Sequence, residues 1–295
     1  MRVPFIKNNI AAVAFIGLGI IWGTNFLYMR LATQYISPLQ IVFLRVVISV
    51  LPLLVLGLVT RAFKKWHLKH WHHFLFMSVL ATVIYYFCFV KGAQILYSGI
   101  AGAMSGATPI FSFVLGTIFI KEEKLTASKV LGLIIGTIGI ILLANPAGLS
   151  SSEDFFKGFL YMIIGSLSFG ASFIYAKKYL SPLNISATAS TSYQLVLATL
   201  ILLVTTDLND IGNILVNTEA FIGLVIGLSL LGTGIAYLIY YYLINRMGAV
   251  KASSVTYIPP VVALAVGIII GNEPISILDC MGAFIVLCGV YLLKK

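Results

Sequence analysis

The chain has 295 residues and is 60% hydrophobic, whereas only 9% of its residues carry a charged side chain. Soluble domains contain about 25% charged residues, so this composition excludes a soluble protein and predicts one that lies in a membrane. The net charge of +10 does not indicate a nucleic-acid partner, because the cations are scattered between apolar runs. The three cysteines lie inside apolar runs without metal-ligand spacing, so neither a metal site nor a cofactor is predicted.

Ten apolar segments follow one another along the chain with short connectors between them. A membrane-spanning helix needs about 20 apolar residues. The segments that reach or approach this length are 10–30, 38–60, 72–93, 99–120, 127–145, 157–177, 185–206, 219–244, 250–271 and 277–293. The first of them is too long for the core of a cleaved signal peptide. The sequence therefore predicts an all-α membrane protein with ten transmembrane helices and no separate soluble domain.

The placement of lysine and arginine predicts the orientation, since cytoplasmic segments of membrane proteins are enriched in both residues. With the N-terminus inside, ten helices leave most acids outside and place fifteen of the 19 cations on the cytoplasmic side. These cations are Arg2, Lys7, Arg61, Lys64, Lys65, Lys69, Lys121, Lys124, Lys129, Lys177, Lys178, Arg246, Lys251, Lys294 and Lys295. We expect a multi-pass protein of the inner, cytoplasmic membrane with both termini in the cytoplasm.

An internal repeat links residues 96–143 to residues 246–293, which align without a gap. The matches that a merely apolar sequence would not produce are Pro109 with Pro259, Glu123 with Glu273, Gly132 with Gly282 and Gly139 with Gly289. Five helices per unit is an odd number, so the second unit must enter the membrane from the opposite side. Such an inverted repeat is typical of transporters, whose substrate site lies between the halves near the bilayer midplane. We therefore expect two repeats, 1–147 and 148–295, around a central cavity.

The first helices of the two units also match, since residues 22–28 (Trp-Gly-Thr-Asn-Phe-Leu-Tyr) align with residues 169–175 (Phe-Gly-Ala-Ser-Phe-Ile-Tyr). Each unit also has a proline and, fourteen residues later, a glutamate that begins Glu-x-Leu or Glu-x-Ile. In addition, Arg45 lies in the second helix. In this order and duplication the chain resembles the EamA family of the drug/metabolite transporter superfamily over nearly its whole length. The resemblance implies ten helices around a central cavity, cytoplasmic termini, and movement of small metabolites, often the export of amino acids.

Polar and aromatic side chains in the middle of the apolar segments are the candidates for a binding site, because polar groups that face lipid are unfavourable. The alternative for the tyrosines is packing or a place in the interfacial belt. A serine or threonine can instead bond to the preceding turn of its own helix. The candidate substrate-binding residues are Trp22, Asn25, Tyr28, Arg45, Tyr86, Ser105, Thr108, Tyr175, Gln194, Tyr237, Thr256 and Tyr257.

Charges within the predicted spans give sharper hypotheses. Arg45 and Lys91 lie in the second and third segments, where each would bind a substrate carboxylate or phosphate, or else extend to the membrane surface. Glu123 and Glu273 lie in short turns, where capping of the helix that follows is favoured over a role in gating. The four histidines fall between residues 67 and 73 beside lysines, which favours a solvated cationic loop over a metal site.

The sequence thus predicts a secondary transporter for a small metabolite, most of all an amino acid or related zwitterion. Its partners would be the substrate and the bilayer, and a homodimer is left open. No acid lies at mid-depth, which disfavours carboxylate-based proton antiport. The alternatives are a carrier of drugs, amines or nucleotide-derived metabolites, or an intramembrane enzyme. Residues 103–106 (Ala-Met-Ser-Gly) resemble the serine motif of intramembrane proteases, but no histidine lies within a predicted span to serve as the base.

Overall fold

The computed structural model describes residues 4–120, 126–144 and 153–293, and these residues form helices and turns without any β-strand. Glu123 and the boundary expected between residues 147 and 148 lie outside the described residues. The α-helices are α1 (Pro4–Ala32), α2 (Pro38–Val59), α3 (Trp71–Ser78), α4 (Tyr85–Ile95), α5 (Ser98–Met104), α6 (Thr108–Phe119), α7 (Ala127–Ala144), α8 (Glu153–Tyr175), α9 (Ala187–Thr205), α10 (Thr218–Ile222), α11 (Ala236–Met247), α12 (Ala249–Ser253), α13 (Ile258–Ile269) and α14 (Ile277–Leu293).

Each of the ten apolar segments is helical over most of its length. Among the described residues, eight helical stretches are long and apolar enough to span a membrane. They are Ile10–Ala32, Pro38–Val59, Lys65–Ile95, Ser98–Phe119, Glu153–Leu183, Ala187–Thr205, Thr218–Met247 and Lys251–Ile269. The remaining two segments form the shorter apolar helices α7 and α14. The expected all-helical membrane fold is confirmed, while the count of ten spans stays a prediction.

Two membrane stretches are interrupted by a 3₁₀ turn at corresponding places in the repeat. The turn Ser105–Ala107 separates α5 from α6, and the turn Ser254–Tyr257 separates α12 from α13. Pro109 and Pro259 are the second residues of α6 and α13. Proline is favoured at the start of a helix because it has no N–H group to bond to the preceding turn. These breaks bring a serine or threonine on each side to the middle of the bundle.

Two other stretches contain a π-helical segment between two α-helices, Val79–Ile84 before α4 and Gly223–Ile235 before α11. They fall in the third helix of each half. A π-helical turn changes the spacing of the backbone hydrogen bonds and is often found at functional sites. In a membrane, a carbonyl that loses its helical partner must find another donor within the protein. The carbonyl of Gly232 does so in the site described below.

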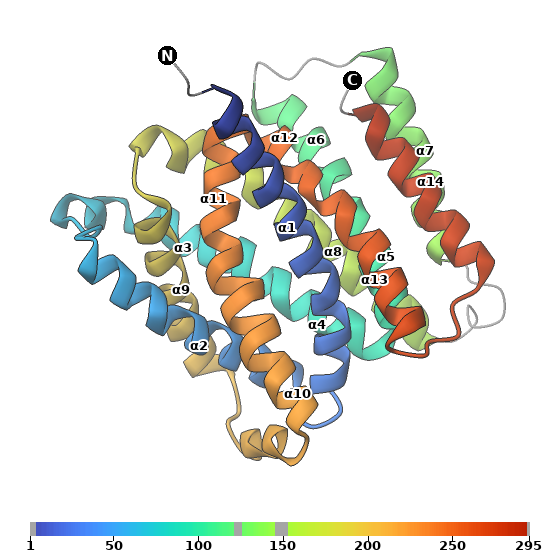
Figure 1. The fold of residues 1–295 in the computed structure, drawn as a ribbon, viewed down its shortest axis with the longest axis horizontal. Helices are drawn as coiled ribbons and strands as arrows, with labels where there is room; N and C mark the ends of the chain where they lie inside the picture. Colours follow the sequence, from blue (N-terminus) through green and yellow to red (C-terminus); the bar gives the residue numbers. More distant parts are fainter. Residues whose placement is uncertain (1–3, 121–125, 145–152, 294–295) are drawn as a thin grey trace.

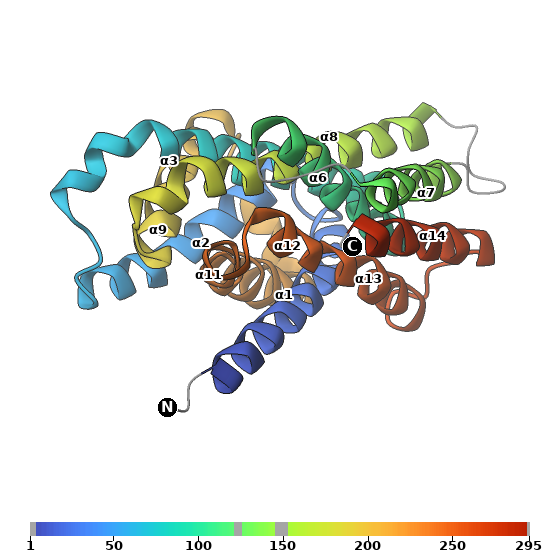
Figure 2. The ribbon, with the colours of Figure 1, turned by 90° about the horizontal axis from the view of Figure 1, so that it is seen from above.

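Helices of the two halves pack in matched pairs, as Figures 1 and 2 show. α7 lies along α14 at one edge of the molecule, and α2 lies along α9 toward the opposite edge. Between these edges, the first helix of each half packs against the fourth helix of the other, so α1 contacts α13 and α8 contacts α6. The start of α1 and the end of α14 lie at the same end of the bundle (Figure 1).

The pair formed by α7 and α14 depends on glycine at its contact. A Cβ atom at Gly289 would overlap the backbone nitrogen of Gly136 and lie 2.5 Å from its Cα. Small residues allow such close backbone approach between membrane helices. We expect Gly289→Ala to destabilise the fold by roughly 1–3 kcal/mol, because the rigid backbone opposite cannot move aside alone. Thermal unfolding of the purified protein in detergent measures this effect.

The matched control is Gly17→Ala in α1, where an added Cβ would have no atom within 4 Å apart from the adjoining residues and the backbone of its own helix. Alanine is favoured over glycine within a helix by about 1 kcal/mol, so this variant should unfold at the same temperature as the parent or slightly above it. Equal unfolding temperatures for the two variants would contradict the glycine contact.

Candidate functional site

A small closed cavity lies where helices of both halves meet. Its free volume is about 10 Å³, which is room for a single water molecule. It is lined by Trp22, Asn25, Phe26, Met29, Tyr85, Phe89, Ser105, Thr108, Phe169, Thr256 and Pro259. Of the predicted site residues, this set contains Trp22, Asn25, Ser105, Thr108 and Thr256. A metabolite cannot fit in this space, so the conformation is a closed one in which the helices meet around the site.

Aromatic rings form one wall of the cavity. The rings of Trp22 and Phe169 meet edge to face, with centroids 5.3 Å apart. These two residues occupy matched positions of the repeat and come from α1 and α8. The ring of Tyr85 stacks on that of Phe169 at 4.0 Å, and Phe26 lies 5.6 Å from Phe89. Such a wall offers a flat apolar surface to a ligand.

Hydroxyl groups face the same space from the two helix breaks. Ser105 Oγ donates to the Gly102 carbonyl at 2.6 Å, and Thr256 Oγ1 donates to the Ser253 carbonyl at 2.7 Å. Thr108 Oγ1 is buried and has no hydrogen-bond partner among the described residues. Buried polar atoms are normally paired, so Thr108 is a group that a ligand or a water molecule can satisfy.

Arg45 lies directly behind this cavity and is completely buried. Its Nε donates to Thr233 Oγ1 at 2.6 Å, and its Nη2 donates to the Gly232 carbonyl at 3.0 Å. The guanidinium carbon lies 3.7 Å from the centre of the Tyr86 ring, where the ring face attracts a cation. Its Nη1 has no partner in the described part of the chain. A fully buried cation with a free donor can take up an anion if the neighbouring helix moves.

Asn25 and Trp22 connect Arg45 to the cavity wall. The surrounding donors and acceptors assign the Asn25 amide so that its oxygen accepts from Arg45 Nη2 at 3.2 Å and its nitrogen donates to the Ile21 carbonyl at 3.1 Å. Trp22 Nε1 donates to the Gly232 carbonyl at 3.3 Å, so this carbonyl accepts from both Trp22 and Arg45. The predicted role of Arg45 as a direct binding group is therefore not realised in the closed conformation, because α1 separates it from the cavity.

Three further predicted residues belong to the buried polar layer around Arg45 and do not line the cavity. The Tyr86 hydroxyl lies 3.1 Å from Thr233 Oγ1. Gln194 Nε2 donates to Thr82 at 2.8 Å, while its oxygen accepts from the Tyr241 hydroxyl at 2.6 Å. The Tyr237 hydroxyl donates to the carbonyl of Ala81. Tyr86, Gln194 and Tyr237 therefore hold the third helices of the two halves to the helices around them.

Glu273 lies in the connection between α13 and α14 and accepts three hydrogen bonds. Its Oε1 accepts from Arg30 Nη1 at 2.7 Å and from the Ser98 backbone N–H at 2.8 Å, and its Oε2 accepts from the Gly99 N–H at 2.9 Å. The carboxylate thus ties α1 to the first turn of α5. The expectation that Glu273 caps the helix that follows it is wrong, since Asp279 accepts from the Ser276 N–H at the start of α14.

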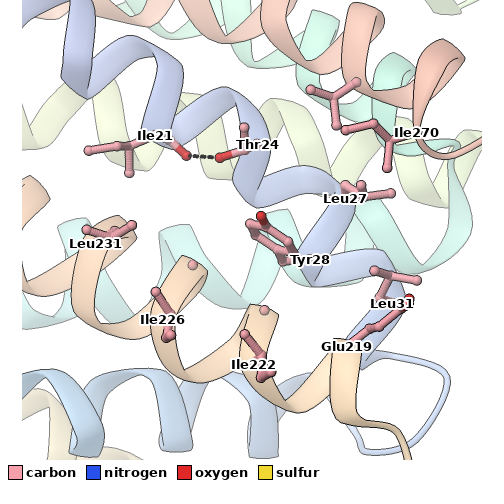
Figure 3. A pocket seen from close by; sticks show the side chains of 13 residues that line it. Ile21, Thr24, Leu27, Tyr28, Leu31, Glu219, Ile222, Ile226, Leu231 and Ile270 are labelled. Carbon is pink, nitrogen blue, oxygen red and sulfur yellow. Dashed lines mark hydrogen bonds between the residues drawn. The ribbon is translucent and has the colours of Figure 1, made fainter.

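Tyr28 and Tyr175 do not reach the cavity. Figure 3 shows Tyr28 in a lateral groove of about 500 Å³ between α1 and the Thr218–Ile235 stretch, a space far larger than the central cavity. Tyr175 lies in a corresponding groove, which α8 forms with α3 and α6. Both tyrosines stand on a different face of their helix from the residues that line the cavity. Tyr257 is half-buried and does not line the cavity, and Lys91 donates to Gln94 at the surface, as a lysine that extends to the interface does.

The sequence did not predict several residues that line the cavity, because an apolar side chain cannot be told apart from its neighbours in an apolar helix. Phe26, Met29 and Phe89 are of this kind. Phe169 could have been found, because the repeat places it at the position of Trp22. Among the described residues, no group of three or more His, Cys, Asp or Glu side chains is placed to hold a metal ion.

An all-helical membrane protein whose helices converge on a buried polar and aromatic cavity has the architecture of a polytopic membrane transporter. Comparison with known families agrees with this class. The chain belongs to the EamA-like transporter family, whose sequence profile matches residues 9–145 and again residues 156–294.

Three relatives of this chain are transporters by name. The transporter YoaV of Bacillus subtilis is 25% identical over 280 residues, which cover 94% of each chain. A transporter of Archaeoglobus fulgidus is 25% identical and covers 93% of this chain and 95% of its own. The inner membrane transporter YedA of Escherichia coli is 27% identical and covers 95% and 89%. A crystal structure with 16% identity matches 96% of each chain with a TM-score of 0.67, which shows the shared fold.

Proposed function

We propose that the protein is a secondary transporter that moves an amino acid or a related zwitterion across the inner membrane by alternating access. The observation that carries this proposal is the buried Arg45 with an unpaired Nη1, set one layer behind a cavity of aromatic rings and hydroxyl groups. The aromatic wall suits an apolar side chain. The guanidinium suits a carboxylate, which it can bind through two parallel hydrogen bonds once α1 moves aside.

The proposal includes ten membrane spans arranged as two inverted repeats, 1–147 and 148–295. Three findings support it. The family profile matches twice, at 9–145 and 156–294. The first helix of each half packs against the fourth helix of the other half. The start of α1 and the end of α14 lie at the same end of the bundle (Figure 1). A chain that crosses the membrane an even number of times has both termini on one side, so this arrangement is consistent with two cytoplasmic termini.

We propose that alternating access uses the contact between Glu273 and α1, which holds one side of the cavity closed. Glu273 holds α1 and α5 together on one side of the site. Opening that side requires the ion pair with Arg30 to break, which would let the cavity expand toward that face while the other face stays packed. No carboxylate lines the central cavity among the described residues, so we propose a facilitator, or coupling through a group other than a midplane acid.

Binding by purified protein tests the substrate class. We expect amphipathic amino acids to raise the unfolding temperature, because a ligand at one hundred times its dissociation constant adds about 2.7 kcal/mol if it binds only the folded state. The measurement is thermal unfolding in detergent against a panel of amino acids, amines, sugars and nucleotide sugars. Stabilisation by sugars or nucleotide sugars alone would contradict the proposed substrate, and stabilisation by amines alone would favour the drug and amine alternative.

A ligand found in this panel can then be used to distinguish a carrier from an intramembrane enzyme. Ser105 bonds to the carbonyl of Gly102 on its own helix, as serines in membrane helices commonly do. A transporter should exchange its stabilising ligand across proteoliposomes without changing it chemically. A hydrolysed product that disappears with Ser105→Ala would favour the enzyme instead.

A further inference from the structure

Two lateral grooves of the same construction lie on the molecule, each between the first helix of one half and the third and fourth helices of the other. The Tyr28 groove, of about 500 Å³, lies between α1 and the Thr218–Ile235 stretch. The Tyr175 groove, of about 300 Å³, lies between α3, α6 and the end of α8. It is lined by Phe76, Leu80, Leu115, Phe119, Ala171, Ile174, Tyr175, Lys178 and Tyr179. Tyr28 and Tyr175 are matched in the repeat, so equivalent helices build the two grooves.

The two grooves differ in charge. The charged residue in the lining of the Tyr28 groove is Glu219, whereas Lys178 is the charged residue in the lining of the Tyr175 groove. Lys178 is exposed, and no carboxylate pairs with it in the part of the chain that the structure describes. Its Nζ lies 5.5 Å from the centre of the Phe119 ring and 5.4 Å from that of Tyr179. The lysine therefore stands at an aromatic rim with its charge available.

A second polar group lies at the same end of the Tyr175 groove. His73 Nδ1 and the Tyr175 hydroxyl are 2.8 Å apart, and the ring of Phe76 packs on that of Tyr175 at 4.4 Å. His73 comes from the start of α3 and Lys178 from the turn after α8, which places both near one membrane face. Along the same helix, Ala171 lies seven residues before Lys178, which is about 10 Å deeper by the helical rise. The groove is thus polar at its mouth and apolar at depth.

We propose that the Tyr175 groove binds an anionic phospholipid, with its phosphate at Lys178 and an acyl chain along the apolar floor. The ammonium group supplies a point charge for the phosphate, and the aromatic rim keeps it near the surface. The floor formed by Leu80, Leu115 and Ile174 suits a hydrocarbon chain. Lys178 also belongs to the cations expected on the cytoplasmic side, where anionic lipids attract positively charged side chains.

The Tyr28 groove supplies the contrast within one molecule. It has the larger volume and is also lined mainly by apolar side chains, but the carboxylate of Glu219 belongs to its lining. A phosphate there would meet a like charge. If apolar shape alone governed binding, both grooves would take lipids of any headgroup, whereas the charge at Lys178 predicts selection for an anionic headgroup in the Tyr175 groove.

The test compares lipids on the purified, full-length protein in neutral detergent. Phosphatidylglycerol should raise the unfolding temperature in a saturable way, and phosphatidylcholine with the same acyl chains should do so far less. Lys178→Glu should raise the half-saturating concentration of phosphatidylglycerol about tenfold, because it replaces an attractive charge with a repulsive one. Lys178 is exposed, so without lipid this variant should unfold at the temperature of the parent.

Two further variants separate the groove from a general charge effect. Lys177→Glu makes the same change of charge at the neighbouring residue, which does not line the groove, and should leave the response to phosphatidylglycerol within twofold of the parent. Ala171→Phe fills the deep end and should weaken binding while all charges stay in place. Three outcomes would each overturn the proposal: equal effects of the substitutions at 177 and 178, an equal response to both lipids, or full stabilisation by inorganic phosphate alone.

Discussion

Replacing Arg45 with glutamine should weaken binding of a carboxylate substrate at least tenfold and leave binding of the matching decarboxylated amine unchanged. A hydrogen bond to a charged group contributes about 1.5–3 kcal/mol, and 1.4 kcal/mol is a factor of ten in affinity. The carboxylate would lose the partner that we assign to it, while the aromatic wall of the cavity would still hold the apolar part of both ligands. Binding of the acid and the amine is measured on the same preparation by thermal unfolding or calorimetry.

The surroundings of Arg45 indicate that this variant will fold. The Gly232 carbonyl also accepts from Trp22 Nε1, and Thr233 Oγ1 also donates to the Leu228 carbonyl. Removal of the guanidinium therefore leaves both of these partners with a hydrogen bond, and the penalty of an unsatisfied buried group is confined to the Asn25 amide oxygen, which loses its donor Nη2.

Arg45→Lys is the matched control, because it keeps the positive charge but loses the two parallel donors. Its affinity for the acid should lie between those of the parent and the glutamine variant. If Arg45→Gln weakened the acid and the amine equally, the role of Arg45 would be structural, as a link between α2 and the π-helical turn that carries Gly232.

Replacing Glu273 with glutamine should open the site toward the face on which Glu273 lies. The carboxylate accepts hydrogen bonds from Arg30 and from two backbone N–H groups, and only 4% of its side chain is exposed. Glutamine carries no charge, and its single amide oxygen cannot replace both carboxylate oxygens. We expect the contact between α1 and α5 to weaken by several kcal/mol, since each charged hydrogen bond contributes about 1.5–3 kcal/mol.

A cysteine at Ser105 reports this opening, because Ser105 lines the central cavity. In a protein whose native Cys88, Cys280 and Cys288 are replaced by serine, a membrane-impermeant thiol reagent should label it at least ten times faster after Glu273→Gln. Glu219→Gln removes an exposed acid near the same end of the molecule and should leave the rate unchanged. Labelling at the same rate in the Glu273→Gln protein and its parent would exclude Glu273 as the closing contact.

The sequence by itself determined the class of the fold and the position of nearly every helix. The length of the apolar runs was sufficient for this, because a bilayer fixes the number of apolar residues that a crossing helix needs. The start of the third helix and the end of the sixth were missed, since 3₁₀ and π-helical turns extend them into the polar sequence of Lys65–His70 and Ala176–Leu180. The repeat was also visible in the sequence, and it matches Phe169 with Trp22, whose rings are in contact.

The candidate site was only half determined by the sequence. Trp22, Asn25 and Met29 follow one face of α1, and Tyr28 lies on another, yet only the packing of α13 and α8 decides which face meets the cavity. The partners of Arg45 are Thr233 and Gly232, which no spacing along the chain connects to it. In a membrane, apolar side chains face both lipid and protein, so the hydrophobic pattern does not distinguish the inside of the bundle from its outside. That distinction comes from helix contacts between residues far apart in the chain, and only the tertiary structure contains them.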